Sequence, residues 1–209
     1  MSGEQKYKEG DGPMLTQETT NSAELLVFSD RCQVYKTRLS EFADTKASSL
    51  GEYLPGKLGF DDGESFFCAC LPGSYEGSIL FFFENGKAAK VALSAYDTKS
   101  NRRKLTGAYS DKSPLKAALC PQEDEQLALY CSDGRALIIS PSQLAVKTTR
   151  ATQGVAVMTL KKNAVLTRAV PLRETPIVNA ARYRARSLPA AGALLRQEDS
   201  EEKQISLEL

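Results

Sequence analysis

The chain has 209 residues, of which 42% are hydrophobic and 25% charged, a composition typical of a folded globular protein. No apolar run reaches the ~18 residues that a transmembrane helix needs, and the polar start "MSGEQKYKEGDG" is no secretory signal, so we expect a cytoplasmic protein without a membrane partner. The chain contains no histidine, which argues against zinc sites and removes the commonest general base near neutral pH.

The formal net charge of +1 hides an uneven distribution along the chain. Residues 1–84 carry 7 basic and 14 acidic side chains, whereas residues 85–172 carry 14 basic and 6 acidic ones. The last 37 residues carry 6 of each. A nearly neutral protein of this kind still presents a strongly positive region, which favours a polyanionic partner.

Residues 1–22 resemble the end of a structural repeat that recurs further along the chain. Their sequence "EGDGPMLTQETT" is similar to "DDGESFFCACLP" at 61–72, but no hairpin precedes it. We therefore expect this segment to be the end of a truncated unit, and the chain to be a piece of a longer protein.

Three full repeats follow, over residues 23–72, 73–121 and 122–172. Each opens with two short β-forming runs joined by a turn: 25–28 with 34–39, 79–82 with 88–93, and 127–130 with 136–141. Asn-Gly before Lys87 and Asp-Gly before Arg135 predict type I′ turns. Cys32 takes the place of that glycine in the first repeat, which suggests a different turn there.

The second half of each repeat is also shared. A polar-to-bulky signature at 40–42, 94–96 and 142–144 leads to a glycine (Gly51, Gly107 or Gly154) and then to a β-rich run at 65–71, 115–120 or 165–170. Units of about 50 residues with several strands predict propeller-like blades, because helical repeats show an apolar period near 3.6. We expect an all-β fold of about three blades and a partial one.

Residues 173–209 do not fit the repeat. The run "QEDSEEKQ" at 197–204 is acidic, and we expect an irregular C-terminal tail that is disordered from about residue 195. Five cysteines without C-x-x-C spacing lie among β-forming residues and predict reduced thiols that pack as small hydrophobic side chains.

Several of these motifs together resemble the C-terminal domain of the DNA-cleaving polypeptide of the bacterial type IIA topoisomerases, which is gyrase A in DNA gyrase and its counterpart in topoisomerase IV. The resemblance is carried by the hairpins "LLVFSDRCQVYKTRLSEF" and "SILFFFENGKAAKVALSAY" and above all by "KTTRATQGVAVMTL" at 147–160. It covers about residues 5–172, and "RYRARSLPAAGALL" is similar to the end of such a polypeptide.

The resemblance implies a β-pinwheel, a propeller-like disc whose blades exchange strands and whose basic rim binds and bends duplex DNA. It also implies a domain with no catalytic residue and no cofactor of its own. The parent would be an ATP- and Mg-dependent isomerase. The expected partners are then duplex DNA, the N-terminal breakage-reunion region of the same polypeptide, and the separate ATPase subunit.

The sequence departs from the family in one place. The glutamine-arginine-arginine-glycine-glycine-arginine-glycine box of gyrase is absent, and "NRRKLTG" at 101–107 and "TRATQG" at 149–154 lack its double glycine. This departure leaves gyrase and topoisomerase IV as alternatives and tells against tight wrapping of DNA.

A protein that bends duplex DNA without reading its sequence needs lysine and arginine along a curved surface, because affinity then comes from the release of counterions from phosphates. Basic residues in the polar connections are the first candidates: Lys99, Arg102, Arg103, Lys104, Lys112, Lys147, Arg150, Lys161 and Lys162. The second group lies on the hairpins: Lys87, Lys90 and Arg135. Arg182, Arg184 and Arg186 either contact DNA or pack the tail against the disc.

Two other functions remain open from the sequence. The acidic first part or the apolar blade edges could make the chain a propeller-like scaffold for another protein. A hydrolase is disfavoured, because no pair of nucleophile and base can be named. The steep salt dependence of DNA binding distinguishes the DNA-binding domain from the scaffold.

Overall fold

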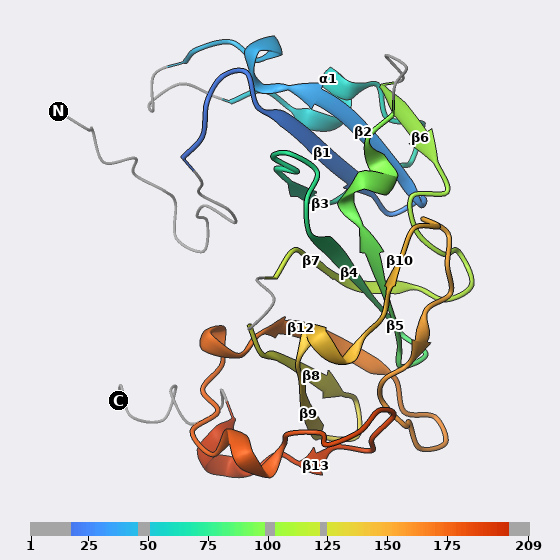
Figure 1. Cartoon of the computed structure of the whole chain (residues 1–209), viewed down its shortest axis with the longest axis vertical. Coiled ribbons are helices and arrows are strands. Elements are labelled where there is room, and N and C mark those ends of the chain that lie inside the picture. The colour runs from blue at the N-terminus through green and yellow to red at the C-terminus, as the bar shows by residue number, and fades with distance from the viewer. Residues whose placement is uncertain (1–17, 46–50, 99–102, 122–124, 201–209) are drawn as a thin grey trace, which may run out of the picture. The chain divides into compact units, whose positions relative to one another are not determined.

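The computed structural model describes residues 18–45, 51–98, 103–121 and 125–200, and their regular structure consists mainly of short β-strands joined by turns and loops (Figure 1). These residues belong to two compact units: Met1–Gly73 with Asn101–Thr106, and Ser74–Ser100 with Gly107–Leu209. Within the described ranges, no helix combines the length and apolar character needed to cross a membrane.

The first unit contains one four-stranded sheet in the order β3-β1-β2-β6. The hairpin strands are β1 (Glu24–Ser29) and β2 (Gln33–Arg38), and β3 (Phe66–Cys70) and β6 (Lys104–Thr106) pair antiparallel with their outer edges. The short helix α1 (Leu54–Leu58) was not predicted. It begins with a proline in its first turn and ends where Gly59 adopts a φ of +68°.

The second unit contains two sheets. In the sheet β10-β5-β4-β7, the hairpin strands are β4 (Ser78–Phe83) and β5 (Lys87–Ala92), and β7 (Leu115–Leu119) pairs with β4. Two short strands pair with β5: β10 (Val146–Lys147) runs parallel to it, and β11 (Val155–Ala156) runs antiparallel.

The other sheet of this unit has the order β12-β8-β9-β13. Its hairpin strands are β8 (Leu127–Cys131) and β9 (Arg135–Ile139), and they pair with β12 (Leu166–Pro171) and β13 (Ala193–Leu194) respectively. Short 3-10 turns follow the three return strands, at Leu39–Glu41, Leu93–Tyr96 and Pro141–Gln143, where the sequence has its polar-to-bulky signature. The repeating hairpins and outer strands predicted from the sequence are confirmed.

Each sheet receives its last strand from the next repeat along the chain. Thr106 pairs with Gln33, and Ala156 pairs in the same way with Lys87, so the first residue of each return strand faces a strand from the second half of the following repeat. The sheets therefore extend past the boundaries of the sequence repeats. This is the strand exchange that the resemblance implies.

The tail supplies the last of these exchanged strands, which was not predicted from the sequence. Gly192 lies 38 positions after Gly154, and β13 pairs with β9 as β11 pairs with β5. A Cβ atom at Gly192 would lie 2.5 Å from the carbonyl oxygen of Ala136, and one at Gly154 would lie closer still to that of Ala88. Glycine lets both backbones approach a return strand at this point.

Disorder from about residue 195 was also expected, and this is wrong for residues 196–200. Asp199 is completely buried, and its Oδ2 accepts a hydrogen bond of 2.6 Å from the hydroxyl of Tyr183. Its Oδ1 accepts from the backbone N–H groups of Val178 and Asn179. The end of the described tail is thus attached to the unit through a buried carboxylate.

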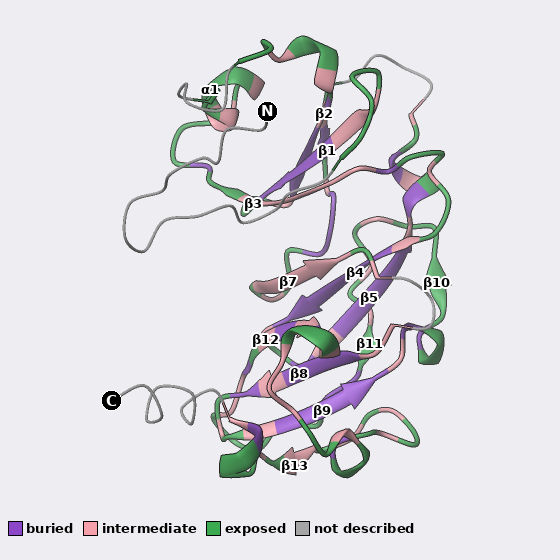
Figure 2. Cartoon of the chain, turned by 90° about the vertical axis from the view of Figure 1, so that its left-hand side faces the viewer, coloured by how far each residue is buried: buried purple, intermediate pink, exposed green. Residues whose placement is uncertain are grey.

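The cores consist of the apolar residues of the hairpins, and Figure 2 shows β8 and β9 buried along most of their length. One cluster in the second unit joins both sheets, because Leu80 and Phe82 of β4 pack with Leu129 and Leu137. Cys131 belongs to this core. Cys120 is exposed, so not every thiol packs as a small hydrophobic group.

The hairpin turns differ from the predicted type I′. Among the described residues of the turns, only Cys32, Gly86 and Gly134 have positive φ, at 57°, 76° and 78°, whereas a type I′ turn needs two such residues. Gly86 N–H donates to the carbonyl of Phe83 at 3.0 Å, which matches a tight turn followed by one left-handed residue. Cys32 adopts the same backbone conformation as the glycines.

Candidate nucleic-acid interface

The two described candidates of the first unit, Arg103 and Lys104, each lie beside a carboxylate. The side chain of Arg103 is 78% exposed, and its Nη1 lies 3.3 Å from Glu41 Oε2. Lys104 Nζ lies 2.7 Å from Asp61 Oδ2 and 5.5 Å from the centre of the Tyr35 ring. Lys99 and Arg102 lie outside the described residues.

Hydrogen bonding stabilises the charged forms of the Lys104–Asp61 pair. The bond to Asp61 raises the pKa of Lys104. The pKa of Asp61 is lowered, first by the hydrogen bond from Gln33 Nε2 and then by the one from Lys104. The positive charges that β6 brings to this sheet are therefore largely compensated by acids of the same unit.

Lys90 was predicted to contact DNA, but the structure buries its side chain. It lies in the middle of β5, is 5% exposed, and its Nζ donates a hydrogen bond of 3.1 Å to the carbonyl of Pro141. This burial and this hydrogen bond show that the lysine points into the unit rather than toward solvent.

Arg135 and Arg150 also use their guanidinium groups within the second unit. Arg150 Nη1 donates to the carbonyl of Ala95 at 2.9 Å, and Arg135 Nη1 donates to that of Gly192 at 3.1 Å. Both side chains are half-buried. They hold the exchanged segments against their sheets, and little of each is exposed for a phosphate.

The remaining candidates lie on the surface of the second unit. Lys112 is 64% exposed and lies 3.4 Å from Asp111, and Lys161 is 64% exposed with its Nζ 3.8 Å from Asp133 Oδ2. Lys87, at the first position of β5, is half-buried. Exposed cations without a charged partner among the described residues are Lys147 and Lys162.

The tail adds further exposed cations. Arg184 Nη2 donates to Gln126 Oε1 at 3.0 Å, which supports the packing alternative for this residue. Arg182 and Arg186 are exposed and have no charged partner in the part of the chain that the structure describes. One sequence signal could have identified this segment: Gly192 repeats Gly154 at a distance of 38 residues. The same offset aligns Arg184 with Val146 of β10, and both residues pair parallel with a return strand.

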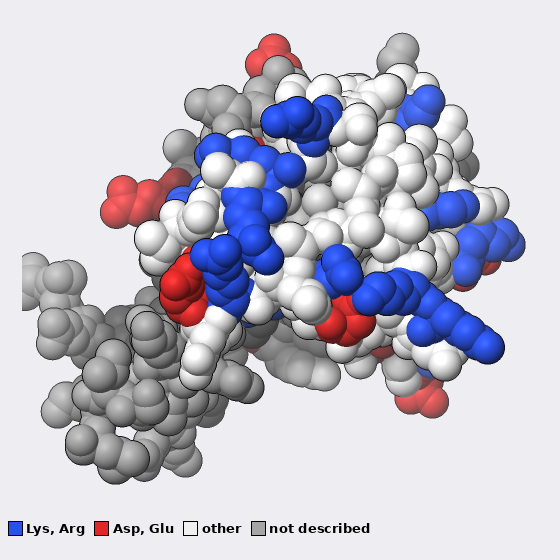
Figure 3. Space-filling view, turned by 90° about the horizontal axis from the view of Figure 1, so that it is seen from below, with Lys and Arg blue, Asp and Glu red and all other residues white. Residues whose placement is uncertain are grey.

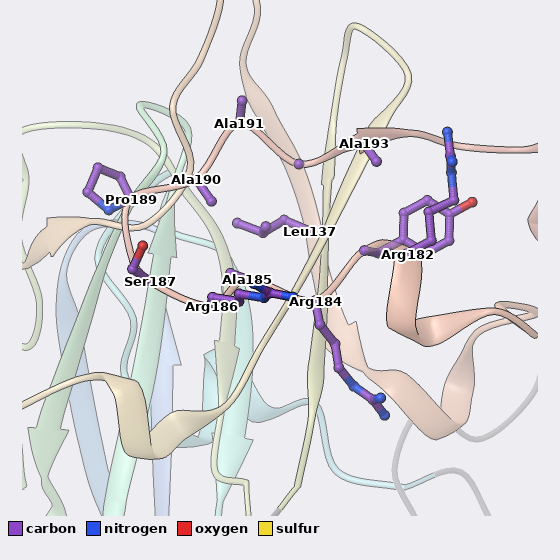
Figure 4. Close-up of a pocket in the computed structure, with 12 residues that line it drawn as sticks. Leu137, Arg182, Arg184, Ala185, Arg186, Ser187, Pro189, Ala190, Ala191 and Ala193 are labelled. Carbon is purple, nitrogen blue, oxygen red and sulfur yellow. The ribbon is translucent and has the colours of Figure 1, made fainter.

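These arginines line a pocket of about 340 Å³ between the tail and β9 (Figure 4). Leu137 forms its floor, and the loop from Ser187 to Ala191 forms one side. The Arg184 side chain points away from this loop in Figure 4, in agreement with its bond to Gln126. The lining thus combines three arginines with small side chains such as Ala190 and Ala193.

On the one face that Figure 3 shows, the cations lie in separate patches. On the face in Figure 3, lysine and arginine side chains form separate groups, and aspartate or glutamate side chains touch some of them. Such a surface can bind a polyanion through several separate phosphate contacts. Among the described residues, no group of three or more cysteine or carboxylate side chains is arranged to hold a metal ion.

No protein-family model and no curated protein sequence matches the chain. Similar solved structures do exist. The C-terminal domain of DNA topoisomerase IV is 23% identical with a TM-score of 0.63, and the alignment covers 75% of this chain and 49% of that one. The DNA gyrase A C-terminal domain is 17% identical with a TM-score of 0.58, and the alignment covers 87% and 64%.

The Escherichia coli ParC C-terminal domain is 15% identical with a TM-score of 0.64, and the alignment covers 92% of this chain and 84% of that one. The chain thus spans about half the length of the topoisomerase IV domain and less than two thirds of the gyrase domain. With its antiparallel sheets and exchanged strands, the chain has the β-pinwheel fold of these topoisomerase C-terminal domains.

Proposed function

We propose that the chain is a non-catalytic DNA-binding domain from the DNA-cleaving polypeptide of a type IIA topoisomerase, which bends duplex DNA and directs it to an attached breakage-reunion region. The proposal is supported by the fold, which this chain shares with C-terminal domains of DNA topoisomerase IV, DNA gyrase A and ParC. The parent enzyme would use ATP and Mg through its other regions and subunits. Cleavage and ATP hydrolysis are then activities of the parent rather than of this chain.

The observation that carries the proposal is a set of exposed cations on the second unit. Lys147, Lys162, Arg182 and Arg186 reach solvent without a carboxylate partner among the described residues. They lie on segments that connect or complete the sheets, so their backbones are fixed by strand pairing close by. Each phosphate contact releases condensed counterions, which gives affinity without reading bases.

The test is a titration of a mixed-sequence duplex at several salt concentrations, read by fluorescence anisotropy. We expect the logarithm of the association constant to fall linearly with the logarithm of salt concentration. The variants Lys147→Ala and Arg186→Ala should each reduce the slope by about one, since each removes one phosphate contact. Energy transfer between dyes at the two duplex ends should report bending on the same samples.

The matched control is Arg38→Ala, which removes an exposed cation of the first unit that lies 3.9 Å from Glu24. Its salt slope should equal that of the unmodified chain. Absent binding, or affinity that does not depend on salt, would contradict the proposal and favour the scaffold.

A further inference from the structure

The turn that precedes the outer strand of each sheet has the same construction in the first and last sheets, and we call it the closing turn. In the first unit, Glu64 N–H donates to the carbonyl of Asp61 at 3.0 Å. In the last sheet, Ala164 N–H donates to that of Lys161, also at 3.0 Å. The residue before each donor, Gly63 or Asn163, has a φ of 70° or 64°.

The closing turns are also attached to the hairpin turns in the same way. Asp30 N–H donates to the carbonyl of Ser65, and Ser132 N–H donates to that of Val165. In return, Ser65 N–H donates to Asp30 Oδ1 at 2.9 Å, and Val165 N–H donates to Ser132 Oγ at 3.0 Å. The two turns therefore present equivalent positions on their own sheets.

The charge at these equivalent positions changes from sheet to sheet. The first closing turn has Asp61 and Asp62, and the last has Lys161 and Lys162. The middle sheet differs: Glu84 N–H donates to the carbonyl of Pro114, which places Ser110 and Asp111 at the corresponding positions. The equivalent positions thus carry two negative charges in the first sheet and two positive charges in the last.

In the first and last closing turns, the second residue of the pair carries the charge that is not compensated. The first residue is partly compensated, because Asp61 pairs with Lys104 and Lys161 lies near Asp133. Asp62 and Lys162 are exposed, and neither has a charged partner among the described residues. A phosphate backbone that approached these turns would be repelled by Asp62 and attracted by Lys162.

We propose that the closing turns select which blades hold DNA: the last one binds the phosphate backbone through Lys162, and the first one keeps its blade off the duplex through Asp62. This inference rests on the proposed function and deepens it. The surface that binds DNA then leaves out the first unit and does not include every blade. Salt screens the interaction between a turn and a phosphate beyond about 8 Å at physiological ionic strength. The charge of a closing turn therefore affects DNA binding only where that turn faces the duplex.

The test uses the full chain and the salt titration of a mixed-sequence duplex. Lys162→Asp should flatten the salt slope by about one, since it removes one phosphate contact. Asp62→Lys should steepen the slope by about one, because the introduced lysine occupies the position that binds phosphate in the last sheet. The double variant has the original net charge and should restore the original slope.

The control is Asp44→Lys, which makes the same change of net charge at an exposed acid of the first unit outside the closing turn. Its slope should stay that of the unmodified chain. If Asp62→Lys and Asp44→Lys had equal effects, net charge alone would explain the binding and this inference would be overturned, while the proposed function would stand. If the unmodified chain did not bind duplex DNA, the proposed function itself would fail.

Discussion

Glu64 links the closing turn of the first unit to its sheet through a buried carboxylate. Its oxygens accept hydrogen bonds from the hydroxyls of Ser29 and Tyr35 and from the backbone N–H of Asp61. Burial raises the pKa of Glu64, but these hydrogen bonds together outweigh it, and the pKa lies below its ordinary value of 4.5. Burial also raises the pKa of Tyr35 to about 12, helped by its bond to Glu64.

The lowered pKa of Glu64 makes stability depend on pH. The ionised carboxylate stabilises the fold fully above its unfolded pKa, and this contribution is lost as the pH falls through the lower, folded pKa. Glu64→Gln should therefore reduce the free energy of unfolding by about 1–3 kcal/mol at pH 7, with the difference shrinking at pH 3. Urea unfolding followed by circular dichroism at both pH values tests this, with the exposed Glu76→Gln as the control that shows no difference.

The residues that could be recognised from sequence were those whose role depends on local chemistry. Lysines in turns, such as Lys161 and Lys162, were predicted to be exposed, and they are. Lys90 was not recognised as buried, because the carbonyl that its Nζ contacts belongs to Pro141, 51 positions later in the chain. The sequence around Lys90 contains no sign of that distant contact.

The exchanged strands depend on a glycine at the point where their backbone comes closest to the return strand. Gly134 and Gly192 both have strongly positive φ, but only Gly192 would bring a Cβ against backbone. Gly134→Ala should cost about 1 kcal/mol from backbone strain alone. Gly192→Ala should cost clearly more, because β13 must move away from β9.

Hydrogen exchange of the β9 amides measures this difference directly. Faster exchange at the residues opposite β13 is expected in Gly192→Ala and not in Gly134→Ala. Equal losses of protection in the two variants would show that the close approach does not determine the pairing.

The elements that the sequence revealed were the hairpins, whose apolar runs and turn residues lie close together in the chain. The exchanged strands were harder to predict, because β10, β11 and β13 are only two residues long. Strands this short cannot show the alternation of apolar and polar residues that identifies a β-strand in a sequence. The tail strand was missed for a second reason: its repeat begins only 38 residues after the previous one, without a hairpin of its own. The helix α1 occupies part of the stretch that the other repeats give to an exchanged strand.

The two units differ in charge when taken as wholes. The described residues of the first unit include six basic and nine acidic side chains, and those of the second include fifteen basic and nine acidic ones. Bound duplex DNA should therefore slow amide exchange in the second unit, at residues 145–163 and 182–192, and leave residues 24–44 unchanged. Exchange with and without DNA, followed by mass spectrometry, measures this, and protection spread evenly over both units would argue against it.

The tail strand has a consequence for any shortened form of this protein. Without β13, the backbone groups that pair with it at Arg135 and Ala136, the start of β9, would be open to solvent beside an apolar strand, a geometry that favours edge-to-edge pairing between molecules. A chain cut before Gly192 should thus aggregate through β9, whereas one cut after Ser200 should remain monodisperse in light scattering. The last residues of the described fold act as a protective cover against self-association.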